Sequence, residues 1–497
     1  MRIRYLTTIF LPLLVCYATA LAAESVDDKA ARFGACSLSP ATLHPGEALT
    51  LRIQVPAEAL GGVEFRHQYH VAPENVPQGF AYSRVQRVAY LADPGERLIH
   101  DNGSLDADPA KGTIEVRIDT TAWAVRLYHF KVSLQDAKGG VSDERDFGVK
   151  VAAPDERIEA HVSPSWRLCT GTHPQRVLRL RNGTLLHEQY VSTDNGATWT
   201  ERSPGTVGAG AVQLRDGTVL GMNYRTFPVE GRAGWYRGER YVSTDDGGSV
   251  EGPIETLFHV PQAKAAEGHA YHPGPLFMRS IVERPDGSLV ALMAGWFIGD
   301  DAPCPYNPKR PYSRTYCCES ADRGATWTFL SNMGYDHIGS EGYNEGSMKA
   351  LPDGTLMAVM RTGSMSDPKC QDNPIMLATS SDWGKTWTAP RRTGVMGAFP
   401  DLAVLSDGVL ALSYGRPGSN IVFSLDQGKT WIGHTIVDPV MYSGYTTITE
   451  TAPGEILMVY GAKNYFEPST GTRRNDLRVA RMAYRGVIDE SGANGLH

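Results

Sequence analysis

The sequence predicts an all-β protein in which an N-terminal β-sandwich precedes a six-bladed β-propeller. Two repeated turn motifs carry this prediction: five copies of a Ser-x-Asp-x-Gly turn and six Gly-containing hairpin turns, which alternate between apolar runs. A chain of 497 residues, 41% of them hydrophobic, can bury a large core. At roughly 100–200 residues per domain, that length suggests two to four domains or one large repeat fold.

The first segment, residues 1–22, has the pattern of a secretory signal peptide. Arg2 and Arg4 precede an apolar run from Ile9 to Tyr17, and Ala20-Leu21-Ala22 offers a small-residue cleavage site. We therefore expect cleavage after Ala22 and an exported protein, periplasmic or secreted. No later stretch has the length and apolarity of a membrane span, so none is expected.

The net charge and the cysteines limit which binding partners, disulfides and metal sites can be expected. The net charge of −7 arises from 48 basic and 55 acidic residues without long runs, which argues against a nucleic-acid partner. Six cysteines follow the signal segment; in an oxidising compartment they could form disulfides, or they could be inert buried thiols. The absence of a Cys-x-x-Cys pair makes a zinc site the weaker alternative, and we expect no metal and no cofactor. The six are Cys36, Cys169, Cys304, Cys317, Cys318 and Cys370.

Residues 23–153 are predicted to form the sandwich, an immunoglobulin-like accessory domain without catalytic residues. Apolar and polar residues alternate along 49–55 and 113–118, as they do in half-buried strands. A short, polar, Pro-containing stretch at 152–157 is typical of a linker. Beyond it we expect the propeller over 160–487, then a tail at 488–497.

Both repeated turns lie in the predicted propeller. The Ser-x-Asp turns begin at Ser192, Ser243, Ser320, Ser380 and Ser424, and in four of the five a Trp ends the motif. In such a turn Asp and Ser bond backbone amides, Gly adopts a left-handed conformation and Trp packs between sheets. The hairpin turns contain Gly183, Gly217, Gly287, Gly354, Gly408 and Gly454. Six hairpins indicate six sheets, and we expect the last blade to borrow a strand from the start of the repeat region.

These Ser-x-Asp-x-Gly-x-Thr-Trp repeats resemble the Asp-boxes of the sialidase (neuraminidase) superfamily. Further residues extend the resemblance: Glu345 stands 16 residues before Arg361, the two flank a hairpin, and Gly415-Arg416 precedes the last turn motif. Ser443-Gly444-Tyr445-Thr446-Thr447-Ile448 is similar to the family's nucleophile motif. The resemblance implies that Tyr445 is the nucleophile and Glu345 its base. It also implies that Arg361 and Arg416 bind the carboxylate of an acidic oligosaccharide or glycoconjugate.

The chemistry of these residues is coherent in itself. Guanidinium groups can hold a carboxylate bidentately. A tyrosine with a pKa near 10 needs a neighbouring base to act as a nucleophile. Ion pairing between blades is the alternative for the arginines, and blade packing is the alternative for Tyr445.

The first blade departs from the family pattern. His173 stands where the first Arg of the family belongs, and no loop carries the family's acid/base Asp. Arg176 could supply the missing guanidinium, and His173 could be a new acid/base. In the third blade, Arg279 is a further candidate for binding the substrate. Asp300 follows it by 21 residues, much as the family's Asp follows its first Arg, so Asp300 or Asp301 on the long loop is another acid/base candidate. His269 and His272 could together bind a metal, but they stand on a loop flanked by Gly and Pro rather than on a helix, which makes a metal site the weaker alternative.

The predicted function is that of an exported, retaining exo-glycosidase of the exo-α-sialidase type, which releases an acidic sugar such as sialic acid. One alternative is a propeller lyase, or another glycosidase, acting on a uronate-containing polysaccharide. In a lyase, arginines would neutralise the carboxylate while His173, His269 or Tyr445 moved the proton. Another alternative is a non-catalytic glycan-binding propeller.

Overall fold

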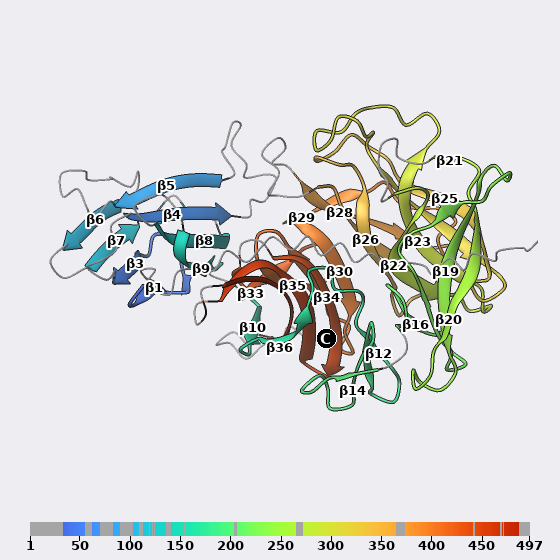
Figure 1. Ribbon diagram of the computed structural model, residues 1–497, viewed down its shortest axis with the longest axis horizontal. Coiled ribbons are helices and arrows are strands. Elements are labelled where there is room, and N and C mark those ends of the chain that lie inside the picture. The colour runs from blue at the N-terminus through green and yellow to red at the C-terminus, as the bar shows by residue number, and fades with distance from the viewer. Residues whose placement is uncertain are drawn as a thin grey trace, which may run out of the picture.

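The computed structural model is all-β, and its strands form two groups along the chain (Figure 1). Predictions for the signal segment 1–22, for the tail 488–497, for His269 and for Cys370 lie outside the described residues. Residues described are 33–54, 62–69, 83–89, 103–108, 113–118, 120–121, 123, 125–135, 141–153, 156–202, 206–264, 272–363, 373–440, 443–467, 470 and 472–486.

The N-terminal group contains two sheets that share one core. Strand order is β1-β3-β7-β6 in the first sheet and β2-β9-β8-β4-β5 in the second. Leu49 and Leu51 of the first sheet and Phe130 and Val149 of the second belong to one buried cluster. The alternation in the sequence placed two paired strands correctly, because Leu49 of β3 lies opposite Ile118 of β7. The strands are β1 (Cys36–Ser39), β2 (Thr42–Leu43), β3 (Leu49–Gln54), β4 (Gly62–Tyr69), β5 (Ser83–Ala89), β6 (Gly103–Asp108), β7 (Thr113–Ile118), β8 (Arg126–Gln135) and β9 (Val141–Val151).

The second group forms the propeller and begins with the strand that closes it. Strands β10 and β11, from the start of this region, both pair antiparallel with β36, the last strand of the chain. This agrees with the expectation that the last blade takes a strand from the start. The strands as far as the second blade are β10 (Ile158–Val162), β11 (Trp166–Thr170), β12 (Leu178–Arg179), β13 (Leu185–His187), β14 (Tyr190–Ser192), β15 (Thr200–Glu201), β16 (Val212–Gln213), β17 (Val219–Met222), β18 (Phe227–Pro228), β19 (Trp235–Ser243) and β20 (Glu251–His259).

The remaining strands complete the ring. Sheets β12–β15, β26–β29 and β30–β33 each have four strands in sequence order. Strands β20 and β25 pair in parallel and join two successive blades into one ten-stranded sheet. Over the residues that the structure describes, the strands of this region form five sheets, of which the ten-stranded one contains two blades. The strands are β21 (Ala263–Lys264), β22 (Leu276–Glu283), β23 (Leu289–Phe297), β24 (Arg314–Ser320), β25 (Thr326–Gly334), β26 (Asn344–Ala350), β27 (Leu356–Arg361), β28 (Pro374–Ser380), β29 (Arg391–Met396), β30 (Ala398–Val404), β31 (Leu410–Gly415), β32 (Ser419–Ser424), β33 (Ile432–Asp438), β34 (Ser443–Ala452), β35 (Glu455–Glu467) and β36 (Thr472–Gly486).

The repeated turns fold as their residues predict. In all five Ser-x-Asp turns the Ser hydroxyl donates to the Asp carboxylate at 2.7–2.8 Å and accepts the Gly N–H at 2.8 Å. The copy at Ser243 keeps this geometry although it has lost its Trp. Trp327, which ends the third copy, is fully buried at 0% exposure. Each turn is therefore a local staple whose Trp, where present, adds core area.

The cysteines that the structure describes are free thiols. Cys304, Cys317 and Cys318 are buried, whereas Cys36 and Cys169 are half-buried. The disulfide alternative is wrong for these five, and the buried-thiol alternative describes three of them. Burial raises the pKa of the Cys317 thiol to about 12, which keeps it protonated and unreactive.

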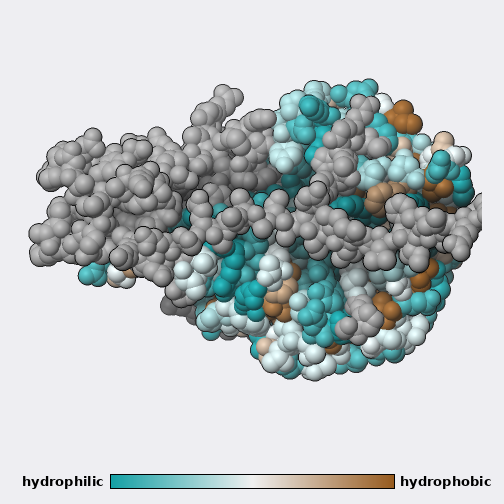
Figure 2. All heavy atoms as spheres, viewed as in Figure 1, coloured by the Kyte–Doolittle hydropathy of each residue, from teal (hydrophilic) through white to brown (hydrophobic). Residues whose placement is uncertain are grey.

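The visible surface is mixed in polarity. Where the face in Figure 2 is described, hydrophobic residues are scattered among hydrophilic ones. Among the described residues no helix is long and apolar enough to cross a membrane. The exposed large hydrophobic residues are Val125, Phe227, Ile298 and Tyr306.

Candidate active site

The site is built from β-bulges in the innermost strands of four successive blades. Register shifts occur at 277–281 in β22, 344–347 in β26, 398–401 in β30 and 443–446 in β34. A bulge bends its strand and re-aims a side chain. The four bulges hold Arg279, Glu345, Phe399 and Tyr445, and the first three have positive φ angles of 51°, 25° and 51°. Such angles are costly for residues with side chains, and they tend to cluster at functional sites.

The central contact joins Tyr445 and Glu345. The Tyr445 hydroxyl donates to Glu345 Oε1 at 3.0 Å. The other carboxylate oxygen, Oε2, accepts from Arg361 Nη1. Arg361 also donates through Nη2 to Glu341 at 2.6 Å and through Nε to the Gly363 carbonyl at 3.1 Å. Three of its five N–H groups are thus committed within the protein, which leaves two for any ligand.

The electrostatics fix the protonation state of this pair. Burial alone would raise the pKa of Glu345, but the Arg361 and Arg416 guanidiniums and two hydrogen bonds hold it below its ordinary value. Burial and the Glu345 carboxylate raise the pKa of Tyr445, although Arg416 and Arg361 oppose the shift. At neutral pH the pair is therefore a protonated phenol that donates to an ionised carboxylate.

Arg416 and His173 flank the Tyr445 ring. The Arg416 guanidinium carbon lies 4.9 Å from the centre of that ring. Among the described residues, no carboxylate or carbonyl accepts a hydrogen bond from the Arg416 side chain. The His173 ring lies 4.3 Å from the Tyr445 ring, centre to centre, and its Nδ1 is 2.6 Å from the Thr172 hydroxyl. Burial lowers the pKa of His173, and Arg416 and Lys463 lower it further while Glu345 opposes them.

Arg279 is connected to the Tyr445 ring through the ring of Phe399. Its guanidinium carbon is 3.6 Å from the centre of the Phe399 ring, and Phe399 in turn meets the Tyr445 ring edge-on at 3.8 Å. Arg279 also donates to the Pro174 carbonyl at 3.4 Å. The structure thus connects Arg279 to Tyr445 through Phe399, a residue that the sequence analysis missed. A lone Phe in an apolar strand gives no signal of this role.

A second missed residue, Asp401, holds the inner strands together. Its carboxylate accepts hydrogen bonds from Ser347 at 2.8 Å, from Thr447 at 2.9 Å and from the Ile448 N–H at 3.0 Å. A single charged residue in an otherwise apolar strand was the available signal. Burial alone would raise the pKa of Asp401, but three cations hold it below its ordinary value. These cations are Lys349, Arg279 and Arg176.

The predicted Arg176 belongs to this buried group of charges. Burial lowers the pKa of Arg176, and the Asp401 carboxylate opposes this shift. Lys349 belongs to the same group: burial lowers its pKa to about 7, and Arg176 adds to the effect. The group sets three cations against one carboxylate at the centre of the ring.

Asp300 does not join the residues around Tyr445. Its carboxylate accepts from the Phe297 N–H at 2.7 Å and from Arg314 Nε at 2.8 Å, while its carbonyl accepts from Lys264. Asp301 is exposed and pairs with Lys264 at 3.1 Å. The long loop is therefore fastened to its own blade by these aspartates. An acid/base role for Asp300 stays a prediction, since its carboxylate is engaged by Phe297 and Arg314.

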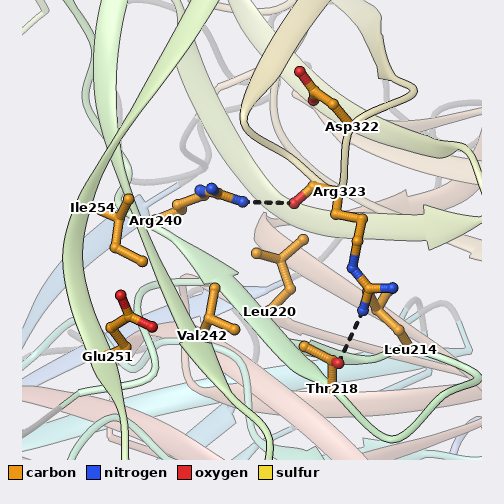
Figure 3. Close-up of a pocket in the computed structure, with 9 residues that line it drawn as sticks. All are labelled: Leu214, Thr218, Leu220, Arg240, Val242, Glu251, Ile254, Asp322 and Arg323. Carbon is orange, nitrogen blue, oxygen red and sulfur yellow. Dashed lines mark hydrogen bonds between the residues drawn. The ribbon is translucent and has the colours of Figure 1, made fainter.

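A pocket of about 370 Å³ lies between the second and third blades, and none of the residues around Tyr445 described above lines it (Figure 3). It is lined by residues such as Thr218, Arg240 and Arg323, and Arg323 donates to the Thr218 hydroxyl at 2.9 Å. Thr218 directly precedes β17, in a hairpin turn, and Arg323 belongs to a Ser-x-Asp turn. None of the residues that line this pocket was predicted to be functional.

No family model matches the chain. An uncharacterized protein of Saccharomyces cerevisiae, YCR100C, is 27% identical over 150 residues, which are 27% of this chain; the chain spans about half (47%) of that relative. Among solved structures, a protein of unknown function from Dyadobacter fermentans DSM 18053 matches with a TM-score of 0.47 and 18% identity, over 66% of this chain and 99% of its own. Hadza microbial sialidase Hz136 matches with a TM-score of 0.42 and 16% identity, over 91% and 95%. Xylan β-1,4-xylosidase from Bacillus halodurans C-125 matches with a TM-score of 0.32 and 12% identity, over 57% and 53%. Likenesses at this level carry no argument about the chemistry of the site.

Proposed function

We propose that the chain is an exported, retaining exo-glycosidase that releases an acidic sugar, such as sialic acid, from glycans. The hydrogen bond from Tyr445 to Glu345 is the observation that carries this proposal. A phenol is a weak nucleophile until a base takes its proton, and an ionised carboxylate at 3.0 Å is that base. Tyrosine is the nucleophile that sialidases use in place of a carboxylate.

Arg416 is the proposed partner of the sugar carboxylate. Its guanidinium lies beside Tyr445 and has no acceptor among the described residues, so its donor fork is available to a planar anion. Arg361, proposed from the sequence for the same role, has fewer N–H groups left because it holds Glu345 and Glu341. Its main contribution would be to keep Glu345 ionised, with the two remaining N–H groups open to the carboxylate.

The reaction would proceed in two displacements at the anomeric carbon. The Tyr445 oxygen bonds to that carbon as the bond to the leaving oxygen breaks; Glu345 takes the phenol proton, and His173 gives a proton to the leaving oxygen. Because burial lowers the pKa of His173, this step uses the protonated form that acidic solution favours. Water then replaces the tyrosine oxygen at the same carbon, His173 takes the proton of the water, and Tyr445 recovers its own from Glu345. Two inversions give retention of configuration.

Lyase chemistry on a uronate polysaccharide is the second candidate, and the contact between His173 and Tyr445 favours it. In that reaction Arg416 would neutralise the uronate carboxylate, one of the two side chains would remove the ring proton, and the other would protonate the leaving oxygen. The product would be an unsaturated sugar that absorbs in the ultraviolet.

Incubating the protein with sialosides and with uronate polysaccharides separates the candidates. If the wild-type protein releases free sialic acid and both Tyr445→Phe and Glu345→Gln abolish this release, the glycosidase is supported. New ultraviolet absorbance supports the lyase. Binding without any product supports a non-catalytic propeller. Tyr306→Phe is the matched control, because Tyr306 is 49% exposed and lies outside the site. Sugar release that survives both site substitutions would refute the glycosidase.

A further inference from the structure

The N-terminal sheets pack against the propeller at one blade. Strands β8 and β9 contact β33, the outermost strand of the sheet β30–β33 (Figure 1). Gly148 of β9 lies so close to Ile436 of β33 that a Cβ at this position would press into the Ile436 side chain. An ion pair between Glu144 and Arg473 adds a contact between β9 and β36. The two groups of strands therefore meet through packed side chains.

His129 of β8 is the buried centre of this contact. The side chain is fully buried at 0% exposure, and its Nδ1 lies 3.5 Å from the Pro439 carbonyl oxygen. Burial lowers the pKa of His129 to about 4, so the ring is neutral at physiological pH. The ring also lies directly against Gly418, where an added Cβ would overlap Cε1 of His129. This glycine has a φ of 66°, and the fit leaves no space for a side chain.

Gly418 belongs to the loop that presents Arg416. This loop joins β31 to β32, and within it the Arg416 N–H donates to the Gly418 carbonyl at 3.2 Å. The Asn420 side chain donates to the Pro417 carbonyl at 2.9 Å. Arg416 itself has a φ of 58°, a conformation that surrounding contacts must hold in place. His129 supplies such a contact two residues away.

The opposite side of the loop touches the strand of Tyr445. Ser419 and Ser443 share a hydrogen bond between their hydroxyls, and Ser443 begins β34. Gly415 lies so close to Gly444 that a Cβ at Gly415 would overlap the Gly444 carbonyl oxygen. The loop is thus clamped between the N-terminal sheets and the nucleophile's strand, and Arg416 is at its bend.

We propose that the N-terminal domain is a positioning element of the active site, with His129 holding the Arg416 loop through Gly418. His129 touches no substrate; it fixes where the Arg416 guanidinium stands relative to Tyr445. The part of this inference that concerns sugar binding rests on the proposed function of Arg416. The part that concerns the loop rests only on the contacts above.

Hydrogen–deuterium exchange of the full chain tests the loop directly. We expect His129→Ala to speed exchange of the amides in 413–420 about tenfold, because local opening loses its packing partner. Arg473→Gln is the matched control: it removes another contact between the two regions away from this loop, and exchange in 413–420 should not change. Equal exchange in the wild-type protein and His129→Ala, or an equal increase in Arg473→Gln, would overturn the proposal.

A second variant approaches the same contact from the propeller side. Gly418→Ala places a Cβ against the His129 ring and should also speed exchange in 413–420. Combined with His129→Ala, the added Cβ no longer meets the ring and keeps only its 2.9 Å approach to the Asp438 carbonyl oxygen, so the double variant should be less perturbed than the sum of the two single variants. Strict additivity would mean that the two residues act independently and would contradict the proposed clamp.

Kinetics give the readout that a purely structural role would not move. His129→Ala should raise KM for an acidic substrate severalfold while kcat falls less, because Arg416 contributes to binding. A fall in kcat with KM unchanged would contradict the proposal that His129 positions Arg416. If the wild-type protein releases no sugar but exchange responds as expected, the proposed function fails and the positioning of the loop stands.

Discussion

Replacing Asp401 with Asn tests how the inner strands of the propeller are held together. The Asp401 carboxylate accepts hydrogen bonds from Ser347 on one neighbouring strand and from Thr447 and Ile448 on the other. An Asn side chain has a single acceptor oxygen, and its NH₂ group would face one of these donors. The substitution therefore removes the negative charge and replaces each hydrogen bond to a carboxylate with one to a neutral amide, or with none.

The magnitude follows from two overlapping effects. A hydrogen bond to a charged group contributes about 1.5–3 kcal/mol, and removing one partner of a buried charge group costs about 3–5 kcal/mol. These effects describe the same contacts and do not add fully, so we expect Asp401→Asn to lower the free energy of unfolding by about 3–5 kcal/mol.

The loss should also depend on pH, because Lys349 is one of the cations that Asp401 compensates. The pKa of Lys349 is about 7 in the folded protein and 10.5 ordinarily. Between those values the unfolded chain binds more protons, so wild-type stability rises with pH across this window. At about pH 9 the folded protein holds Lys349 neutral, and the cost of Asp401→Asn should be smaller than at about pH 6.

Urea unfolding followed by tryptophan fluorescence at both pH values measures these quantities. Asp353→Asn is the control: Asp353 is exposed on a hairpin and accepts one N–H, from Thr355 at 2.9 Å, so its loss should stay below about 1 kcal/mol. Adding Lys349→Met to Asp401→Asn should recover part of the stability at about pH 6. A loss below about 1 kcal/mol, or one that is the same at both pH values, would refute this account.

Three further predictions concern packing and protonation. Gly415→Ala would push on the Gly444 carbonyl, and sugar release should fall at least about tenfold with only a moderate change in melting temperature; unchanged release would show that the strand can shift freely. Burial lowers the pKa of His187 from 6.5 to about 4, so the unfolded chain binds more protons than the folded chain between these pH values. The free energy of unfolding should therefore fall by up to about 3 kcal/mol when the pH is lowered across this window, and it should fall less in His187→Gln. A pH series of unfolding curves measures this difference. Trp327→Ala should cost about 3–5 kcal/mol because Trp327 is fully buried, whereas the half-buried Trp199 should cost less when it is truncated; equal losses in calorimetry would argue against burial as the cause.

The blades could be predicted from the sequence because their turns are local. A Ser-x-Asp turn is closed by residues within five positions of one another, so Ser192 and Asp194 form the same contacts whatever surrounds them. Hairpins likewise need only their own residues. The parallel pairing of β20 with β25 could not be foreseen, because it joins strands of different blades and depends on how two neighbouring sheets meet.

The site was predictable only where a motif marks it. Spacing along the chain drew attention to Glu345, Arg361 and Tyr445, which the structure brings into contact. It could not show that Arg361 is already engaged by Glu341, nor that Asp300 is held by Arg314. Such pairings depend on side-chain directions that bulges and loops set, and a bulge leaves no fixed residue pattern in the sequence.

The bulges in the four innermost strands separate the chemistry of the site from the folding of the blades. The bulged segments of β26 and β30 are skipped by the backbone pairing, which resumes at Ser347 and Asp401. A change of side chain within a bulge therefore disturbs no rung of the sheet. Under the proposed function, a different residue at Phe399 could therefore adapt the ring to a different sugar while the pairing of its strands stays the same. Glu345 is less free to vary, because it is paired with the buried Arg361.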